Sequence, residues 1–133
     1  MNVPIDPSRT YVLLEADGSA LQVPGGEAFW SRPQADLDRF GRRWLVSEFE
    51  CSADWPNWEM HPKADEFVYL LAGEATFLLQ KESGITRIPL KGRAALVVPK
   101  GTWHTAKVSA PSRMLFVTLG AGTRHRPANE GET

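Results

Sequence analysis

The chain has 133 residues, 42% of them hydrophobic and 23% charged, with a formal net charge of −1. This length suits one domain with its own core, and the balanced charge argues against a nucleic-acid partner. The N-terminus lacks the apolar stretch of a signal peptide, no run reaches the ~18 apolar residues of a membrane span, and the single Cys51 rules out an internal disulfide. We therefore expect a cytoplasmic protein with no membrane partner.

The N-terminal third is expected to hold two short strands and one helix. Apolar residues at 11–15 and 21–23 are each followed by a turn signal, which is typical of short strands. The spacing of Phe29, Trp30, Leu37 and Phe40, interrupted by Pro33, predicts one short helix at about residues 34–40.

From residue 42 onward the hydrophobic pattern alternates with a period of two. Strands are predicted near 44–49, 58–62, 67–71, 75–81, 86–90, 94–98, 103–108 and 114–119, with turn signals between them. In particular, Gly73 is expected to turn the chain into a hairpin, and Pro111-Ser112 to separate the last two strands. Many short strands without crossover helices favour an all-β fold, a jelly-roll barrel whose interior can hold a ligand. We expect one domain over 1–133, with its core at about 42–120 and a loose tail over 121–133.

Four side chains are candidates for one shared site. Glu59 and His61 are two residues apart on an extended segment, so they point to the same face. Glu66 follows across a bend at Pro62, and a Pro-x-Gly turn at 99–101 delivers His104 to the start of a strand. Two imidazoles and two carboxylates suit a divalent ion such as Fe, Mn, Ni or Zn, and they leave coordination positions open for a small molecule.

Simpler interpretations exist for each of these residues. Either histidine alone could be a satisfied core or surface residue, and Glu59 could pair with a neighbouring cation. Asp65 could replace Glu66 as a ligand, although the spacing fits Glu66 better. His125 lies between two arginines in the polar tail and is expected to be solvated.

Two motifs resemble the signatures of the cupin superfamily. The first reads Glu59-x-His61, four residues, Glu66, six residues, Gly73. The second reads Gly92, six residues, Pro99-x-Gly101, two residues, His104. Both are in the family's order and at its separation. One departure matters: Glu59 stands where the family usually has a histidine, although glutamate is itself a good metal ligand.

The resemblance implies a jelly-roll barrel and a range of functions that includes dioxygenases, isomerases, epimerases, decarboxylases and binding modules. We expect a metal-binding cupin that acts on or binds an unidentified small molecule, as an oxygenase or isomerase would. His61, Glu66 and His104 would hold the metal, with Glu59 as fourth ligand or general base. The main alternative is a non-catalytic ligand-binding or sensory cupin without metal. A metal-free isomerase using acid and base residues ranks last, because the strands offer no obvious inward arginine.

Large aromatic side chains are predicted on the outer face of the barrel. By alternation, Trp58 faces away from Glu59 and His61, Trp103 away from His104, and Phe67 away from the interior. A small barrel does not expose so many apolar groups without cover. Either the N-terminal segment covers them or the chain forms a homodimer, and we expect the homodimer.

Overall fold

The computed structural model describes residues 3–129, so the last four residues of the expected tail lie outside it. The elements, in chain order, are β1 (Thr10–Leu14), β2 (Ala20–Pro24), α1 (Glu27–Trp30), α2 (Gln34–Phe40), β3 (Trp44–Cys51), β4 (Asn57–Met60), β5 (Glu66–Lys81), β6 (Gly84–Lys91), β7 (Ala94–Val98), β8 (His104–Thr118) and β9 (Arg124–Pro127). The prediction of an all-β fold is confirmed, and α2 matches the predicted helix. α1 was not predicted as a separate helix.

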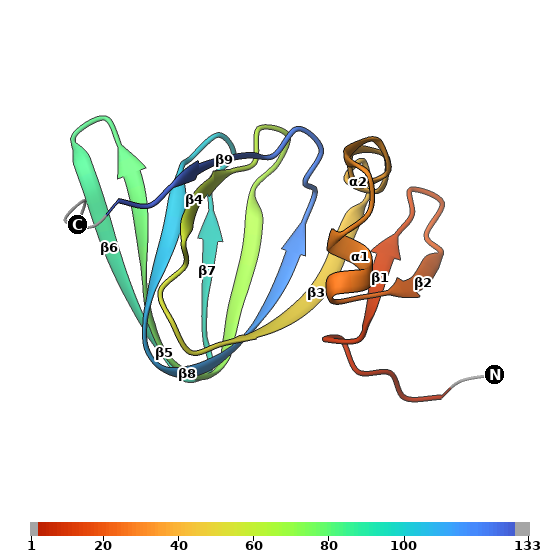
Figure 1. Cartoon of the computed structure of the whole chain (residues 1–133), viewed down its shortest axis with the longest axis horizontal. Coiled ribbons are helices and arrows are strands. Elements are labelled where there is room, and N and C mark those ends of the chain that lie inside the picture. Colours follow the sequence, from red (N-terminus) through yellow and green to blue (C-terminus); the bar gives the residue numbers. More distant parts are fainter. Residues whose placement is uncertain (1–2, 130–133) are drawn as a thin grey trace.

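The two longest strands, β5 and β8, form the frame of a barrel. They run antiparallel to each other along most of their length, and they bend together at one end of the molecule (Figure 1). β5 also pairs with β6 and β7, while β8 also pairs with β3 and β4. The sheet is therefore continuous from β2 at one edge to β9 at the other, and it curls around an interior space.

The predicted hairpin at Gly73 is wrong. β5 continues through this glycine, with its first half paired to β7 and its second half to β6. Gly73 has a φ of 99° inside a stretch of register shifts against β8, and a Cβ there would lie 2.4 Å from the carbonyl oxygen of Pro111. The two turn signals thus meet at one irregularity, where β5 and β8 bend without ending.

The main core fills the barrel interior. Val68 and Leu70 from β5 pack with Met114 and Phe116 from β8, and all four side chains are buried. Each fully buried side chain of this kind contributes about 1.5–3 kcal/mol relative to exposure. Glu66 lies on the same face of β5, so the strand alternation carries a buried carboxylate into the barrel.

A second hydrophobic cluster joins the N-terminal segment to the barrel. Tyr11 of β1 packs edge-on against Phe29 of α1, with ring centroids 5.3 Å apart. Phe40 of α2 and Leu45 of β3 complete the buried face. As Figure 1 shows, α1 and α2 lie beside β1 to β3, so this segment extends one side of the barrel.

The predicted loose tail is also corrected, because part of it forms β9. Residues 124–127 pair antiparallel with β4, and β9 crosses the top of the barrel in Figure 1. The guanidinium of Arg126 lies 4.9 Å from the ring centroid of Trp58 and 5.1 Å from that of Trp103. The C-terminal strand β9 therefore packs on these two rings. Neither cover by the N-terminal segment nor a homodimer, the two explanations expected from the sequence, included this strand. The homodimer stays a prediction.

No helix within residues 3–129 is long and apolar enough to cross a membrane.

Candidate metal centre

Three strands bring the four candidate residues to one end of the barrel interior. Glu59 lies on β4 directly opposite His104, the first residue of β8, and Glu66 is the first residue of β5. His61 follows β4, and its carbonyl oxygen accepts a hydrogen bond of 2.9 Å from the backbone N–H of Gly101. That bond ties the Pro-x-Gly turn before His104 to the segment that carries the first histidine.

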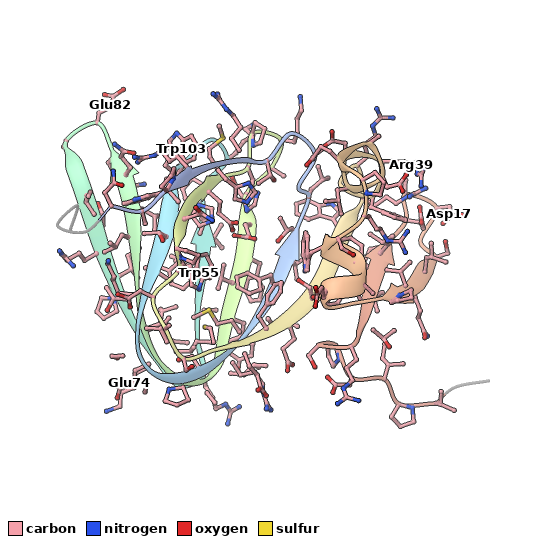
Figure 2. The ribbon with its side chains drawn as sticks, viewed as in Figure 1. Asp17, Arg39, Trp55, Glu74, Glu82 and Trp103 are labelled. Carbon is pink, nitrogen blue, oxygen red and sulfur yellow. The ribbon has the colours of Figure 1, made fainter. Side chains whose placement is uncertain are left out.

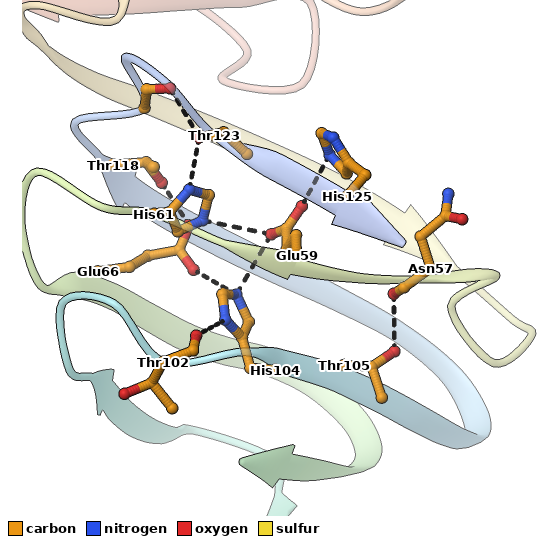
Figure 3. A network of polar contacts seen from close by, with 11 residues as sticks. Asn57, Glu59, His61, Glu66, Thr102, His104, Thr105, Thr118, Thr123 and His125 are labelled. Carbon is orange, nitrogen blue, oxygen red and sulfur yellow. Dashed lines mark hydrogen bonds and ion pairs between the residues drawn. The ribbon is translucent and has the colours of Figure 1, made fainter. Parts of the chain in front are cut away.

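The polar ends of these side chains converge (Figure 3). His61 Nε2 lies 3.4 Å from Glu59 Oε1 and 3.3 Å from Glu66 Oε2. His104 Nε2 lies 3.3 Å from Glu59 Oε1 and 3.3 Å from Glu66 Oε1. Each residue offers one ligand atom, and these four atoms all lie within 4.8 Å of one another. We call these four residues the His/Glu cluster.

Hydrogen bonds behind the cluster fix the proton position on both imidazoles. Thr123 Oγ1 donates its only proton to the carbonyl of Gly120 at 2.6 Å, so its 2.8 Å contact with His61 Nδ1 requires an N–H on Nδ1. His104 Nδ1 contacts the carbonyl oxygen of Thr102 at 3.0 Å, which accepts only. In the neutral form, both rings therefore present the lone pair of Nε2 to the cluster.

Glu66 is oriented in a similar way. Thr118 Oγ1 donates a hydrogen bond of 2.5 Å to Glu66 Oε2. Hydrogen bonds of this kind, from groups behind the ligands, hold metal-binding side chains in their productive orientation.

The donor atoms at the centre fit a metal ion. His61 Nε2, His104 Nε2 and Glu66 Oε1 are buried and make no hydrogen bond of good geometry. Their 3.3–3.4 Å separations exceed the usual length of a charge-assisted hydrogen bond, about 2.7–2.9 Å. Atoms bound about 2.0–2.1 Å from one tetrahedral ion lie about 3.3 Å from each other. Contacts of this length, together with four ligand atoms that all lie within 4.8 Å of one another, are compatible with ligands that share an ion.

Without an ion, the cluster is a set of buried charges that balance. Burial lowers the histidine pKa values, but contacts with Glu59 and Glu66 outweigh burial, raising the pKa of His61 to about 9 and that of His104 to about 10. Burial raises the pKa values of the two carboxyls, and the histidines outweigh it, so the pKa of Glu66 is lowered and that of Glu59 falls well below 4.5. Two protonated histidines and two carboxylates then sum to zero charge.

Two further residues near the site, Asp65 and His125, were considered from the sequence. Asp65 turns away, since its Oδ1 accepts a hydrogen bond of 2.7 Å from the backbone N–H of Lys100. His125 is 57% exposed but is not merely solvated, because its Nε2 lies 3.5 Å from Glu59 Oε2. No sequence pattern predicts this contact or the contacts of Thr118 and Thr123, because none of these residues belongs to a motif.

A cavity of about 490 Å³ adjoins the cluster, and Glu59, His61 and Glu66 form part of its lining. This volume lies in the range of about 300–1,000 Å³ that is usual for small-molecule sites. Glu59, whose side chain is 24% exposed, is the least buried member of the cluster. A small molecule in the cavity would therefore meet the cluster directly.

Comparison with known proteins relies on structure, because no protein-family model and no curated protein sequence matches this chain. A cupin superfamily protein from Desulfitobacterium hafniense DCB-2 superposes with a TM-score of 0.50 at 24% identity, over 59% of this chain and 68% of that protein. This chain has a cupin fold.

Other solved structures are similar to this fold at lower identity. Hydroquinone 1,2-dioxygenase from Sphingomonas sp. TTNP3, with 4-hydroxybenzoate bound, gives a TM-score of 0.51 at 16% identity, over 64% of this chain and 60% of the enzyme. Peruvianin-I, a cysteine peptidase from Thevetia peruviana latex, gives 0.54 at 11% identity, over 65% of this chain and 57% of that protein. Identities this low establish the fold alone.

Proposed function

We propose that Glu59, His61, Glu66 and His104 bind one divalent metal ion, and that the chain acts on or binds a small molecule that reaches this ion from the cavity. The observation that carries the proposal is the arrangement of donor atoms. Both Nε2 lone pairs and two carboxylates converge in a buried place where three of the atoms have no hydrogen-bond partner. Buried polar atoms are rarely left in this state without a functional reason.

Each residue has a distinct part in the proposed site. His61 and His104 supply neutral nitrogen donors because Thr123 and the carbonyl of Thr102 keep their Nδ1 positions protonated. Glu66 supplies an oxygen from the start of β5. A bound divalent ion would supply Lewis acidity, polarising a carbonyl or hydroxyl oxygen of the small molecule.

Two roles were expected for Glu59, and the geometry favours that of ligand. Its Oε1 lies 3.3–3.4 Å from the Nε2 atoms of both histidines, which places it among the donors. Its Oε2 points to His125 on β9. A free general base would need an oxygen that faces the small molecule and is not shared with two imidazoles.

The test is elemental analysis of the purified, tag-free protein, reconstituted in turn with Fe, Mn, Ni and Zn. We expect near-stoichiometric metal in the wild type and loss of the metal in His61→Ala/His104→Ala. Asp65→Asn is the matched control, because Asp65 lies next to Glu66 in sequence but bonds to the backbone of Lys100. This variant should keep its metal.

Absence of metal from the wild type after reconstitution would contradict the proposal, and so would retention of metal by a folded double variant. The first result would favour the alternative of a ligand-binding cupin without metal. If the double variant does not fold, the single variant Glu59→Gln replaces it. Glu59 is the least buried ligand, so its substitution perturbs packing least, and it should weaken metal binding.

A further inference from the structure

The cavity beside the His/Glu cluster has a second wall that the metal proposal leaves unexplained. The N-terminal segment contributes to it through Phe29 and Trp30 of α1 and through Leu37 and Asp38 of α2. The cluster lies on β4, β5 and β8, whereas this wall begins on helices that precede the barrel strands. Residues far apart in the sequence therefore enclose one space.

The wall is made of aromatic rings that follow one another from α1 into the barrel. Centroid distances are 4.8 Å from Phe29 to Trp30, 6.0 Å from Trp30 to Phe49, 5.4 Å from Phe49 to Phe116, and 5.9 Å from Phe116 to Trp55. All five rings line the cavity, and Figure 2 shows Trp55 among the strands of the barrel. We call them the aromatic wall.

Such a wall offers ring faces and edges to a bound molecule. Aromatic pairs prefer offset-stacked or edge-to-face contacts at centroid distances of about 4.5–7 Å, and they add attraction beyond simple burial. Trp30 is 45% exposed and Trp55 only partly buried, so these rings have surface left to cover. A flat aromatic molecule would fill this part of the cavity best.

The charges around the cavity select against an anion. The acidic side chains on its lining are the carboxylates of Asp38, Glu50, Glu59 and Glu66. The histidines His61 and His125 also line it, and none of the lysines or arginines in residues 3–129 does. A divalent ion would offset Glu59 and Glu66, and Arg113 pairs with Glu50, so Asp38 is left as the uncompensated carboxylate on the lining. An anionic ligand would thus meet a negative field with no arginine or lysine to pair with.

We propose that the cavity takes an aromatic molecule that has no anionic group and carries a hydroxyl or carbonyl oxygen. Its ring lies against the aromatic wall, and its oxygen faces the His/Glu cluster. The direction of that oxygen rests on the proposed function, whereas the preference for an aromatic ring without an anionic group rests on the lining alone. The two ideas can therefore fail separately.

The test compares matched two-ring probes by titration calorimetry, with metal and after treatment with EDTA. We expect 2-naphthol to bind on the order of tenfold more tightly than 2-naphthoate, a difference that one unfavourable charge contact can produce. Equal or tighter binding of 2-naphthoate, or no binding of 2-naphthol, would overturn the proposal.

Matched variants test the aromatic wall. Trp30→Ala should weaken 2-naphthol binding on the order of tenfold, because it removes a ring face at the wall. Trp44→Ala is the control, since Trp44 is similarly exposed at 37% and does not line this cavity. Trp30 Nε1 also donates to Tyr11 Oη, so Trp55→Leu at the other end of the wall is a second variant. Equal effects of Trp30→Ala and Trp44→Ala would contradict the assignment.

A second pair of variants tests the charge. Asp38→Lys should strengthen 2-naphthoate binding on the order of tenfold by placing a cation on the lining. Asp36→Lys makes the same change on the same helix at a position that does not line the cavity, and it should leave 2-naphthoate unaffected. Binding of 2-naphthol by a protein that takes up no metal on reconstitution would uphold this inference and contradict the metal proposal; stoichiometric metal without 2-naphthol binding would do the reverse.

Discussion

The two sides of the barrel cavity are built in different ways. The His/Glu cluster comes from the starts of β5 and β8 and from the end of β4 with the residue that follows it. Its side chains are held by a hydrogen bond from Thr118 and by hydrogen bonds that the histidines donate to Thr102 and Thr123. The aromatic wall comes from α1, β3, β8 and the segment before β4, and it is held mainly by ring packing, with one hydrogen bond from Trp30 Nε1 to Tyr11 Oη. The first side holds polar donor atoms and the second forms an apolar surface. Substitutions on the two sides should therefore have separable effects on metal binding and on packing.

The largest effect is expected from His104→Ala, on the cluster side. The imidazole is fully buried between Glu59 and Glu66, so its removal leaves two nearby carboxylates with one histidine. Loss of one partner from a buried charge pair typically costs about 3–5 kcal/mol. Urea unfolding in EDTA should show this loss, whereas His125→Ala, at an exposed position, should stay close to wild type. Equal free energies of unfolding in the two variants would contradict the balance of buried charges in the cluster.

On the aromatic side, Phe116→Ala should destabilise the protein without changing its metal content. The ring is buried, but it borders an existing cavity, which places the cost near the lower end of the range, about 3 kcal/mol. Urea unfolding together with elemental analysis checks both parts. A fall in metal content of the folded variant would show that the two sides are coupled.

The hydrogen bonds behind the ligands should have a smaller effect, seen in metal affinity. Thr123→Val removes the acceptor of His61 Nδ1–H and should weaken metal binding about 10–100-fold. Thr105→Val is the control, because Thr105 is a buried threonine that donates to the carbonyl of Asn57, outside the cluster (Figure 3). Competition titration against a chelator measures both. Similar affinities in the two variants would rule out an orienting role for Thr123.

The smallest expected effect is the change in stability of the metal-free protein per pH unit. His61 and His104 have folded pKa values of about 9 and about 10, above their usual 6.5, so their stabilisation is complete below pH 6.5 and is lost as pH rises toward 10. The lowered pKa values of Glu59 and Glu66 stabilise above pH 4.5, and this contribution is lost in acid.

The melting temperature in EDTA should thus be highest between about pH 4.5 and 6.5 and fall above it. The free energy of unfolding should decrease there by at most about 1.4 kcal/mol per pH unit for each histidine. Bound metal should reverse the alkaline trend, because the ion takes the place of the histidine protons. A flat alkaline profile in EDTA would contradict the ionised pairing.

Sequence reasoning located the cluster because its spacing follows strand geometry. Glu59 and His61 share a face by alternation, and a Pro-x-Gly turn places His104 at the start of a strand. Gly73 was misread because a residue with positive φ is common to turns and to bulges, and only the partner strand decides between them.

The aromatic wall could not be found in this way. Phe29 and Phe116 are far apart in sequence, and nothing local to either residue shows that the two line one cavity. β9 was missed for another reason, since Arg-His-Arg-Pro lacks the apolar alternation by which strands are recognised. Its pairing depends on β4 and on the rings that Arg126 covers.

The position of β9 has a consequence for how the site exchanges its contents. β9 is the last strand at its edge of the sheet, and in residues 3–129 its only strand partner is the four-residue β4. Elements with so few backbone bonds open by local unfolding well before the rest of a domain. Fraying of β9 would withdraw His125 from Glu59 and loosen the segment that carries Thr123. An ion could then enter or leave while β5 and β8 stay folded, so the lifetime of the bound state would follow the fraying of one short strand.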